Sequence, residues 1–218
     1  MKWLLLLALY STSTFARFTL EIGSPVARYS LNESGTSRTV LSDSGSELGF
    51  NYQYESKGAW TWGLGYFSQS YALDSEGAGV TLENDEGTLT KISAYIARGS
   101  KSGWFAQFGL DNTTASYLTE ESTVISVEDQ NRIDLYLKFG TYFKTGFGGG
   151  EISYKYASIP AVKVNGNSLA GAGTEVYFNL YFNKNKNFGL YFRYSNEFTS
   201  GDFDHVLDSR TFGLALAY

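Results

Sequence analysis

The last nine residues, 210–218, alternate strictly between large apolar and small side chains. Phe212, Leu214, Leu216 and Tyr218 are large, and threonine, glycine and alanine stand between them. Successive side chains of a β-strand point to opposite faces, so this period of two predicts a strand with one apolar face. The same pattern recurs along most of the chain, which predicts an all-β protein.

Ten segments show this alternation. They lie at 18–22, 48–54, 60–66, 88–98, 104–110, 133–139, 152–156, 176–182, 188–194 and 210–218. Tight turns are predicted at 55–58, 99–103, 145–146 and 183–187, and longer polar loops at 31–47, 74–87, 118–130, 158–173 and 195–209. The loop at 158–173 contains a predicted turn at Asn165-Gly166. Short turns at one end and long loops at the other are typical of membrane-spanning barrels. We therefore expect a single antiparallel up-and-down transmembrane β-barrel of about ten strands, with eight as the alternative.

A soluble β-sandwich also has short alternating strands and is the other fold that this pattern allows. Its apolar faces would turn toward a core instead of lipid. Aromatic side chains at the predicted strand ends favour the barrel, because they would form a girdle at the membrane interface. The girdle residues are Tyr54, Trp60, Trp104, Phe182 and Phe188.

Residues 1–16 have the pattern of a secretory signal peptide. Lys2 precedes an apolar run from Trp3 to Tyr10, and small residues lead to Ala16. The run is shorter than the roughly 20 residues that a membrane-spanning helix needs. A buried N-terminal helix or strand is the alternative, and residues 17–218 are the predicted barrel.

The C-terminal segment resembles the last strand of bacterial outer-membrane β-barrel proteins, which end in an aromatic residue after alternating apolar residues. The resemblance is to the class of small single-chain barrels, OmpA-like and OmpX-like in style, and to no specific family. It implies that Phe212, Leu214, Leu216 and Tyr218 are recognised by the barrel-assembly machinery, with Tyr218 where phenylalanine is commoner. It also implies an outer-membrane location, surrounded by lipid and lipopolysaccharide. Loop lengths place both termini on the periplasmic side.

The residues between the apolar positions would fill the lumen. Acidic and basic side chains are balanced among them: Glu21, Asp111, Asp134, Glu151 and Glu175, with Lys91, Arg132, Lys138, Lys155 and Arg193. Charges in a narrow lumen must be paired or hydrogen-bonded. Barrels of about eight strands are filled by side chains, whereas wide channels need about 16. We expect a filled lumen, and a narrow pore for ions or small solutes is the alternative.

Composition narrows the chemistry further. The 218 residues include no cysteine, which excludes a disulfide framework and a thiolate metal site. The formal net charge is −5, with no basic patch that would indicate a nucleic-acid partner. Residues 146–150 are glycine-rich but lack the Lys-Ser/Thr of a phosphate loop. We expect no cofactor, no metal and no cofactor-binding residue.

His205 is the only histidine and lies beside Asp204 in the last predicted loop. Barrel enzymes such as omptin-like proteases and lipid A acyltransferases place histidines near acids or serines at fixed spacing, which this chain lacks. We therefore expect no catalytic residue. The expected role is structural, adhesive or in surface display, with an outer-membrane hydrolase or acyltransferase as the most distant alternative. The sequence identifies no external ligand.

Overall fold

The computed structural model describes residues 16–33, 36–55, 60–74, 81–82, 85–99, 103–121, 124–146, 148–182 and 188–217. The strands are β1 (Ala16–Glu33), β2 (Thr36–Glu55), β3 (Trp60–Asp74), β4 (Thr81–Leu82), β5 (Glu86–Gly99), β6 (Trp104–Glu121), β7 (Val124–Lys144), β8 (Gly149–Val164), β9 (Asn167–Tyr181), β10 (Phe188–Gly201) and β11 (Asp204–Ala217). No helix in these ranges is long and apolar enough to cross a membrane. The predicted signal peptide lies outside them, except Ala16, which begins β1.

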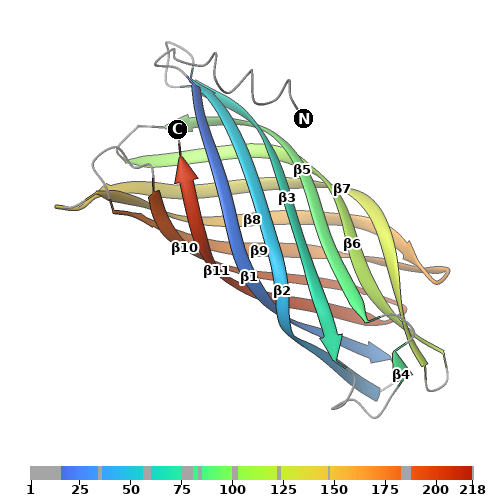
Figure 1. Ribbon diagram of the computed structural model, residues 1–218. Helices are drawn as coiled ribbons and strands as arrows, with labels where there is room; N and C mark the ends of the chain where they lie inside the picture. Colours follow the sequence, from blue (N-terminus) through green and yellow to red (C-terminus); the bar gives the residue numbers. More distant parts are fainter. Residues whose placement is uncertain are drawn as a thin grey trace, which may run out of the picture.

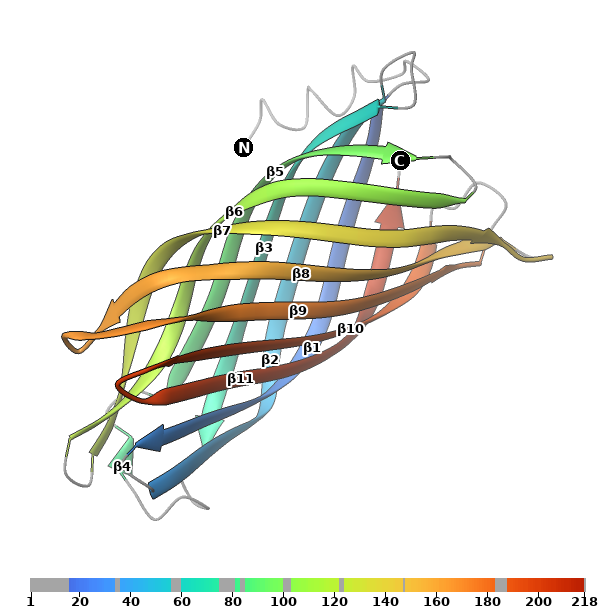
Figure 2. The same ribbon diagram turned by 180° about the vertical axis from the view of Figure 1, so that it is seen from behind.

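Ten of the strands form one closed antiparallel barrel (Figures 1 and 2). Each strand pairs with its neighbours in the chain, β1 pairs with β11, and the pairing of β7 with β8 completes the circle. β4 is a two-residue bridge that runs parallel to the start of β7. The predicted up-and-down barrel of ten strands is therefore confirmed.

The two ends of the barrel differ. Thr19 of β1 pairs with Ala217 of β11, so the chain enters and leaves at one end, which we call the near end. The opposite end is called the far end. The ten barrel strands contain 14–21 residues, whereas a strand needs about 9–11 residues to cross a bilayer. The strands are thus long enough to extend well beyond a membrane.

The prediction of long polar loops was wrong for most of their length. Residues 31–33 and 36–47 belong to β1 and β2, and the segments predicted as loops near residues 118–130, 158–173 and 195–209 are also mainly strand. The predicted turn at Asn165-Gly166 is confirmed. Both of its residues have positive φ angles, 47° and 81°, which is typical of a two-residue hairpin turn.

The physical reason for this error is that the apolar face changes sides along a strand. In the near half of β8, Ile152 and Tyr154 point outward and are exposed, whereas Ser153 points inward. In the far half, Ile159 and Val164 are buried inside the barrel. The outward residues there are polar, so this part of the sequence looks like a loop. The alternation of apolar and polar residues nevertheless continues, with the apolar residues now on the inward face.

The near half of the barrel has an apolar outer surface of the kind that membrane barrels present to lipid. The exposed residues include Ile22, Leu48, Leu64, Ile92, Phe108, Leu137, Tyr156, Phe178, Leu190 and Leu214. We call this surface the belt. All five predicted girdle residues are exposed on the outside as well: Tyr54, Trp60, Trp104, Phe182 and Phe188.

The predicted assembly signal lies on the last strand. Phe212, Leu214 and Leu216 are exposed on the outer face of β11. Tyr218 lies outside the described residues. Recognition of this strand by an assembly machinery stays a prediction, as does the role of the girdle.

Inside the barrel, large aromatic rings lie opposite glycines on neighbouring strands. The directly paired residues are Gly63 and Tyr95, Phe105 and Gly140, Gly109 and Tyr136, Tyr181 and Gly189, and Tyr191 and Gly213. A Cβ atom on Gly109 would lie 2.6 Å from the Tyr136 ring and 2.7 Å from the Ala94 carbonyl oxygen. The glycine therefore lets the tyrosine ring lie flat against the wall.

We expect Gly109→Ala to destabilise the barrel by about 1–3 kcal/mol, because the new methyl group overpacks a site closed by backbone. The measurement is a urea titration of the refolded protein in detergent micelles, followed by tryptophan fluorescence. Gly146→Ala is the matched control, since a Cβ atom there meets nothing within 4 Å. Equal unfolding midpoints for the two variants would show that the Tyr136 ring does not need the glycine.

Candidate functional site

The most fully bonded charge in the lumen is Glu47 of β2, which is 2% exposed. Its carboxylate accepts hydrogen bonds from the Tyr191 hydroxyl at 2.7 Å, the Thr211 hydroxyl at 2.7 Å and the Gln69 amide at 2.5 Å. It also forms an ion pair with Arg193. The donors come from β3, β10 and β11, so this one carboxylate ties four strands together.

Arg193 of β10 is the centre of the first ion-pair cluster. Besides Glu47, its guanidinium contacts Glu21 of β1 at 2.6 Å. Its Nε atom lies 3.6 Å from a Glu175 oxygen, which is too long for a hydrogen bond. Arg193 therefore neutralises two carboxylates directly, and Glu175 is held more loosely.

A second cluster crosses the lumen. Lys91 of β5 contacts Glu197 of β10 at 2.8 Å, and Arg132 of β7 contacts the other oxygen of Glu197 at 2.5 Å. In the closed circle of ten strands, β5 and β10 stand five places apart in either direction. The Lys91–Glu197 pair thus joins opposite walls, and side chains fill the lumen at this level. Arg132 also contacts Asp134 at 2.9 Å.

Two further pairs lie on the side of β7 and β8. Lys155 contacts Asp111 at 2.5 Å, and its ammonium lies 3.9 Å from the centre of the Tyr136 ring. Lys138 contacts Glu151 at 2.9 Å. The structure therefore brings all ten predicted lumen charges into ion pairs, although it arranges them in separate clusters.

The sequence analysis missed three lumen charges. Glu47 and Glu197 fall in stretches that were interpreted as loops, and Arg17 lies at the start of β1, where it donates to the Tyr181 hydroxyl at 2.8 Å. A usable signal was present for Glu47 and Glu197. Glu47 is in phase with the inward Asn51, and Glu197 is in phase with Arg193, so continuing the alternation would have identified both.

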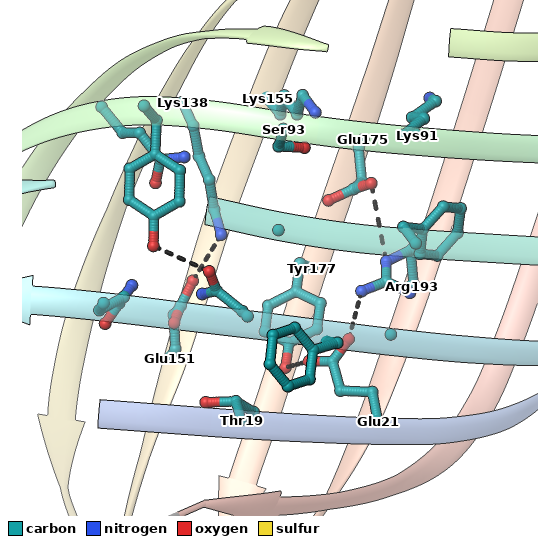
Figure 3. Close-up of a pocket in the computed structure, with 18 of the residues that line it drawn as sticks. Thr19, Glu21, Lys91, Ser93, Lys138, Glu151, Lys155, Glu175, Tyr177 and Arg193 are labelled. Atoms are coloured by element: carbon teal, nitrogen blue, oxygen red, sulfur yellow. Dashed lines mark hydrogen bonds and ion pairs between the residues drawn. The ribbon is translucent and has the colours of Figure 1, made fainter. Parts of the chain in front are cut away.

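The near half of the lumen contains a cavity of about 150 Å³. Figure 3 shows Lys138, Lys155, Glu151, Glu175 and Arg193 around it. This volume is large enough to hold several water molecules. The cavity is therefore a polar, charged compartment and lies on the near side of the Lys91–Glu197 pair.

The far half of the lumen is filled by apolar side chains, which we call the far-end core. Its members are Ala27, Tyr29, Leu31, Val40, Tyr71, Leu73, Leu89, Ala115, Tyr117, Leu118, Ile125, Val162, Val164, Leu169, Phe203 and Leu207. Tyr29, Val40, Leu118, Ile125 and Val164 have essentially no exposed surface. A polar solute would have to leave water to pass this core.

The described residues offer no metal centre, because no group of three or more His, Asp or Glu side chains among them could hold an ion. No protein-family model matches the chain, and no curated protein matches it. Several solved structures do.

The outer membrane protease OmpT from Escherichia coli superposes with a TM-score of 0.55 at 9% sequence identity, covering 95% of this chain and 98% of that one. The fold is that of a bacterial outer-membrane β-barrel. The β domain of the Bordetella autotransporter BrkA has a TM-score of 0.44 at 13% identity, with 94% and 99% coverage. Ail, the attachment invasion locus protein of Yersinia pestis, has a TM-score of 0.38 at 11% identity, with 94% and 100% coverage. Such low identities show the outer-membrane barrel fold alone.

His205 has a different position in this barrel from the one predicted. It lies on β11 and is 3% exposed, instead of lying in an outside loop. Its Nε2 atom accepts a hydrogen bond from the Leu118 backbone at 3.3 Å, and its ring packs against Tyr117 and Tyr29. The histidine was misplaced because the surrounding acidic residues suggested a loop. It is buried against the far-end core, because Tyr117 and Tyr29 are members of that core.

Proposed function

We propose that this protein is a non-enzymatic barrel of the bacterial outer membrane that does not conduct ions and displays its far end outside the cell. The outer-membrane barrel fold and the belt support the location. The far-end core supports the absence of conduction, because a channel would need an open route where this barrel packs apolar side chains. The role is then structural or adhesive, carried out by a rigid rim of strands.

A narrow pore for ions or small solutes is the competing function. The near-half cavity favours it, since the cavity is lined by charges of both signs. Against it stand the Lys91–Glu197 pair, which crosses the lumen, and the far-end core beyond that pair.

Conductance distinguishes the two functions. We expect refolded protein in planar lipid bilayers to give no steady current, under conditions in which a porin prepared in the same way conducts. Steady single-channel currents from the unmodified protein, with an ion selectivity that changes in Lys91→Gln or Lys155→Gln, would contradict the proposal and support the pore.

The orientation is a separate prediction, with the far end outside and both termini in the periplasm. The chain has no cysteine, so single cysteines can report on each end. Ser168 is exposed near the far end and Lys144 is exposed near the near end. We expect a membrane-impermeant maleimide to label Ser168→Cys in intact cells and Lys144→Cys only after the outer membrane is permeabilised. The reverse labelling would invert the assignment.

A further inference from the structure

One pair of neighbouring strands in the barrel wall is not paired along its full length. β7 and β8 pair only from Leu135–Ser158 to Lys144–Gly149. Beyond Leu135, Figures 1 and 2 show β7 turning away from β8 toward the far end. Within the described ranges, residues 126–134 of β7 and 159–164 of β8 have no strand partner on the sides that face each other.

Most other seams continue close to the far end, whereas residues 36–40 of β2 toward β3 and residues 116–121 of β6 toward β5 also lack a strand partner within the described ranges. β1 and β11 pair as far as Asn32 and Asp204, and β8 and β9 pair up to Val164 and Asn167 beside their turn. β7 itself remains paired with β6 up to Val124. The unpaired stretch of β7 is the longest of these, at nine residues, and we call residues 126–134 the free edge.

The same edge of β7 already pairs with a short strand just beyond the free edge. Thr81 and Leu82 of β4 pair in parallel with Val124 and Ile125, on the side of β7 that faces away from β6. Backbone N–H and C=O groups along such an edge are a ready template for another extended chain. Nine residues remain beyond the β4 bridge, which is longer than a typical strand of about 5–6 residues.

The height of the free edge makes it accessible to a partner in water. Leu135, where pairing with β8 stops, is next to Leu110 of the belt, whereas the following outward residue, Ile133, is next to Asn112. Unpaired backbone groups would be costly in hydrocarbon. Beyond Ile133 the outward residues Asn131 and Asp129 are polar and exposed, so the backbone groups of residues 126–132 lie on the aqueous side of the belt.

The charge around the far end restricts the partner further. Among the residues that the structure describes there, the exposed acidic side chains are Asp43, Asp74, Asp85, Glu86, Asp129 and Asp202, and the exposed basic side chains are Arg28, Lys163 and Arg210. Across the seam itself, a Glu128 oxygen accepts a hydrogen bond from the Asn165 backbone at 2.8 Å. An excess of acid attracts a basic chain over the Debye length of about 10 Å.

We propose that the free edge of β7 is a docking site for an extended, basic segment of another polypeptide, which adds to the barrel wall as a further strand. Backbone hydrogen bonds supply the affinity, and the acidic rim selects for basic side chains. The inference deepens the proposed display function and rests on it only for the side of the membrane on which the partner is found. Binding itself needs nothing but the folded barrel.

The test uses a synthetic peptide that copies residues 152–158, the segment of β8 with which β7 already pairs below the free edge. The peptide carries an added terminal cysteine. Asn131→Cys places a thiol on the free edge, and Asn32→Cys on β1 is the matched control. Both asparagines are exposed and lie beyond the belt, but Asn32 is paired on both sides, with Asp204 and Ser37.

We expect the mixed disulfide with Asn131→Cys to form at least about tenfold faster than with Asn32→Cys, because docking raises the effective concentration of the peptide thiol. A strand presents its N–H groups alternately to its two sides, so one of two alternately N-methylated peptides should lose this advantage while the other keeps it. Replacing the peptide lysine with glutamate should slow the reaction.

Equal rates at the two cysteines, or no effect of either N-methylation pattern, would overturn the inference. The assay is done on refolded protein in detergent, where heat-modifiable migration in gels verifies that each variant is folded. Its outcome therefore does not depend on conductance or on orientation in cells. A barrel that conducts but still captures the peptide would refute the proposed function and leave the docking site intact.

Discussion

Replacing Arg193 with methionine is expected to destabilise the barrel by about 3–5 kcal/mol, because a buried carboxylate would lose its cation. Glu47 is 2% exposed and pairs with Arg193, which also contacts Glu21 at 2.6 Å. Methionine keeps much of the side-chain volume and removes the charge. The free energy of unfolding can be measured by urea titration in detergent micelles.

Two further variants separate charge from packing. Glu175→Gln should cost less than about 1 kcal/mol, because Glu175 lies 3.6 Å from Arg193 and its side chain is 20% exposed. The double variant Arg193→Met with Glu47→Gln should be more stable than Arg193→Met alone, because it no longer buries an uncompensated charge. If the double variant loses the full sum of both single losses, the ion pair is not the source of the effect.

Leu137→Arg is expected to cost about 2–4 kcal/mol in lipid vesicles, the range for arginine at the middle of a membrane barrel's outer face. Leu137 is 45% exposed in the belt and is paired with Phe108 on one side and Tyr156 on the other. The measurement is unfolding by urea in phosphatidylcholine vesicles.

Asn131→Arg is the control on the same strand. Asn131 is also exposed and points outward, but it lies beyond the belt. Its replacement should change the free energy of unfolding by less than about 0.5 kcal/mol, as is usual for surface positions. Similar losses in both variants would mean that the belt does not lie in hydrocarbon as proposed.

The sequence alone was sufficient for the barrel, because the belt repeats a simple rule. Phe108, Leu137 and Tyr156 each alternate with inward small or polar residues, and that period of two depends only on strand geometry. The alternation of short and long connections then gave ten strands. These features are local, so no knowledge of the packed structure was needed.

The far half was not predictable by the same rule. Polar residues such as Ser158 and Lys163 face water there, while Ile159 and Val164 turn inward. The bulge between Ile159 and Val162 also shifts the phase of β8. A pattern search that expects large apolar residues on the outside interprets this stretch as loop.

The candidate site was predicted only in part for a related reason. Ten lumen charges were identified from their inward phase, but Glu47, Glu197 and Arg17 were missed at the borders of the predicted segments. Their partners also could not be foreseen, because the Lys91–Glu197 contact depends on which strands face each other across the closed circle. The free edge of β7 depends on where that strand bends, which no local pattern specifies.

The change of apolar face along β8 has a consequence for mutational tolerance. Near its first residues, substitutions that add polarity should be harmful at Ile152 and Tyr154 and better tolerated at Ser153. Past Ala157 the sensitive positions become the inward ones, among them Ile159 and Val164. A saturation scan of this strand would therefore show its sensitivity profile reversing phase between Tyr156 and Ile159. The position of that reversal in the sequence would identify the residues of β8 at which the barrel leaves the bilayer.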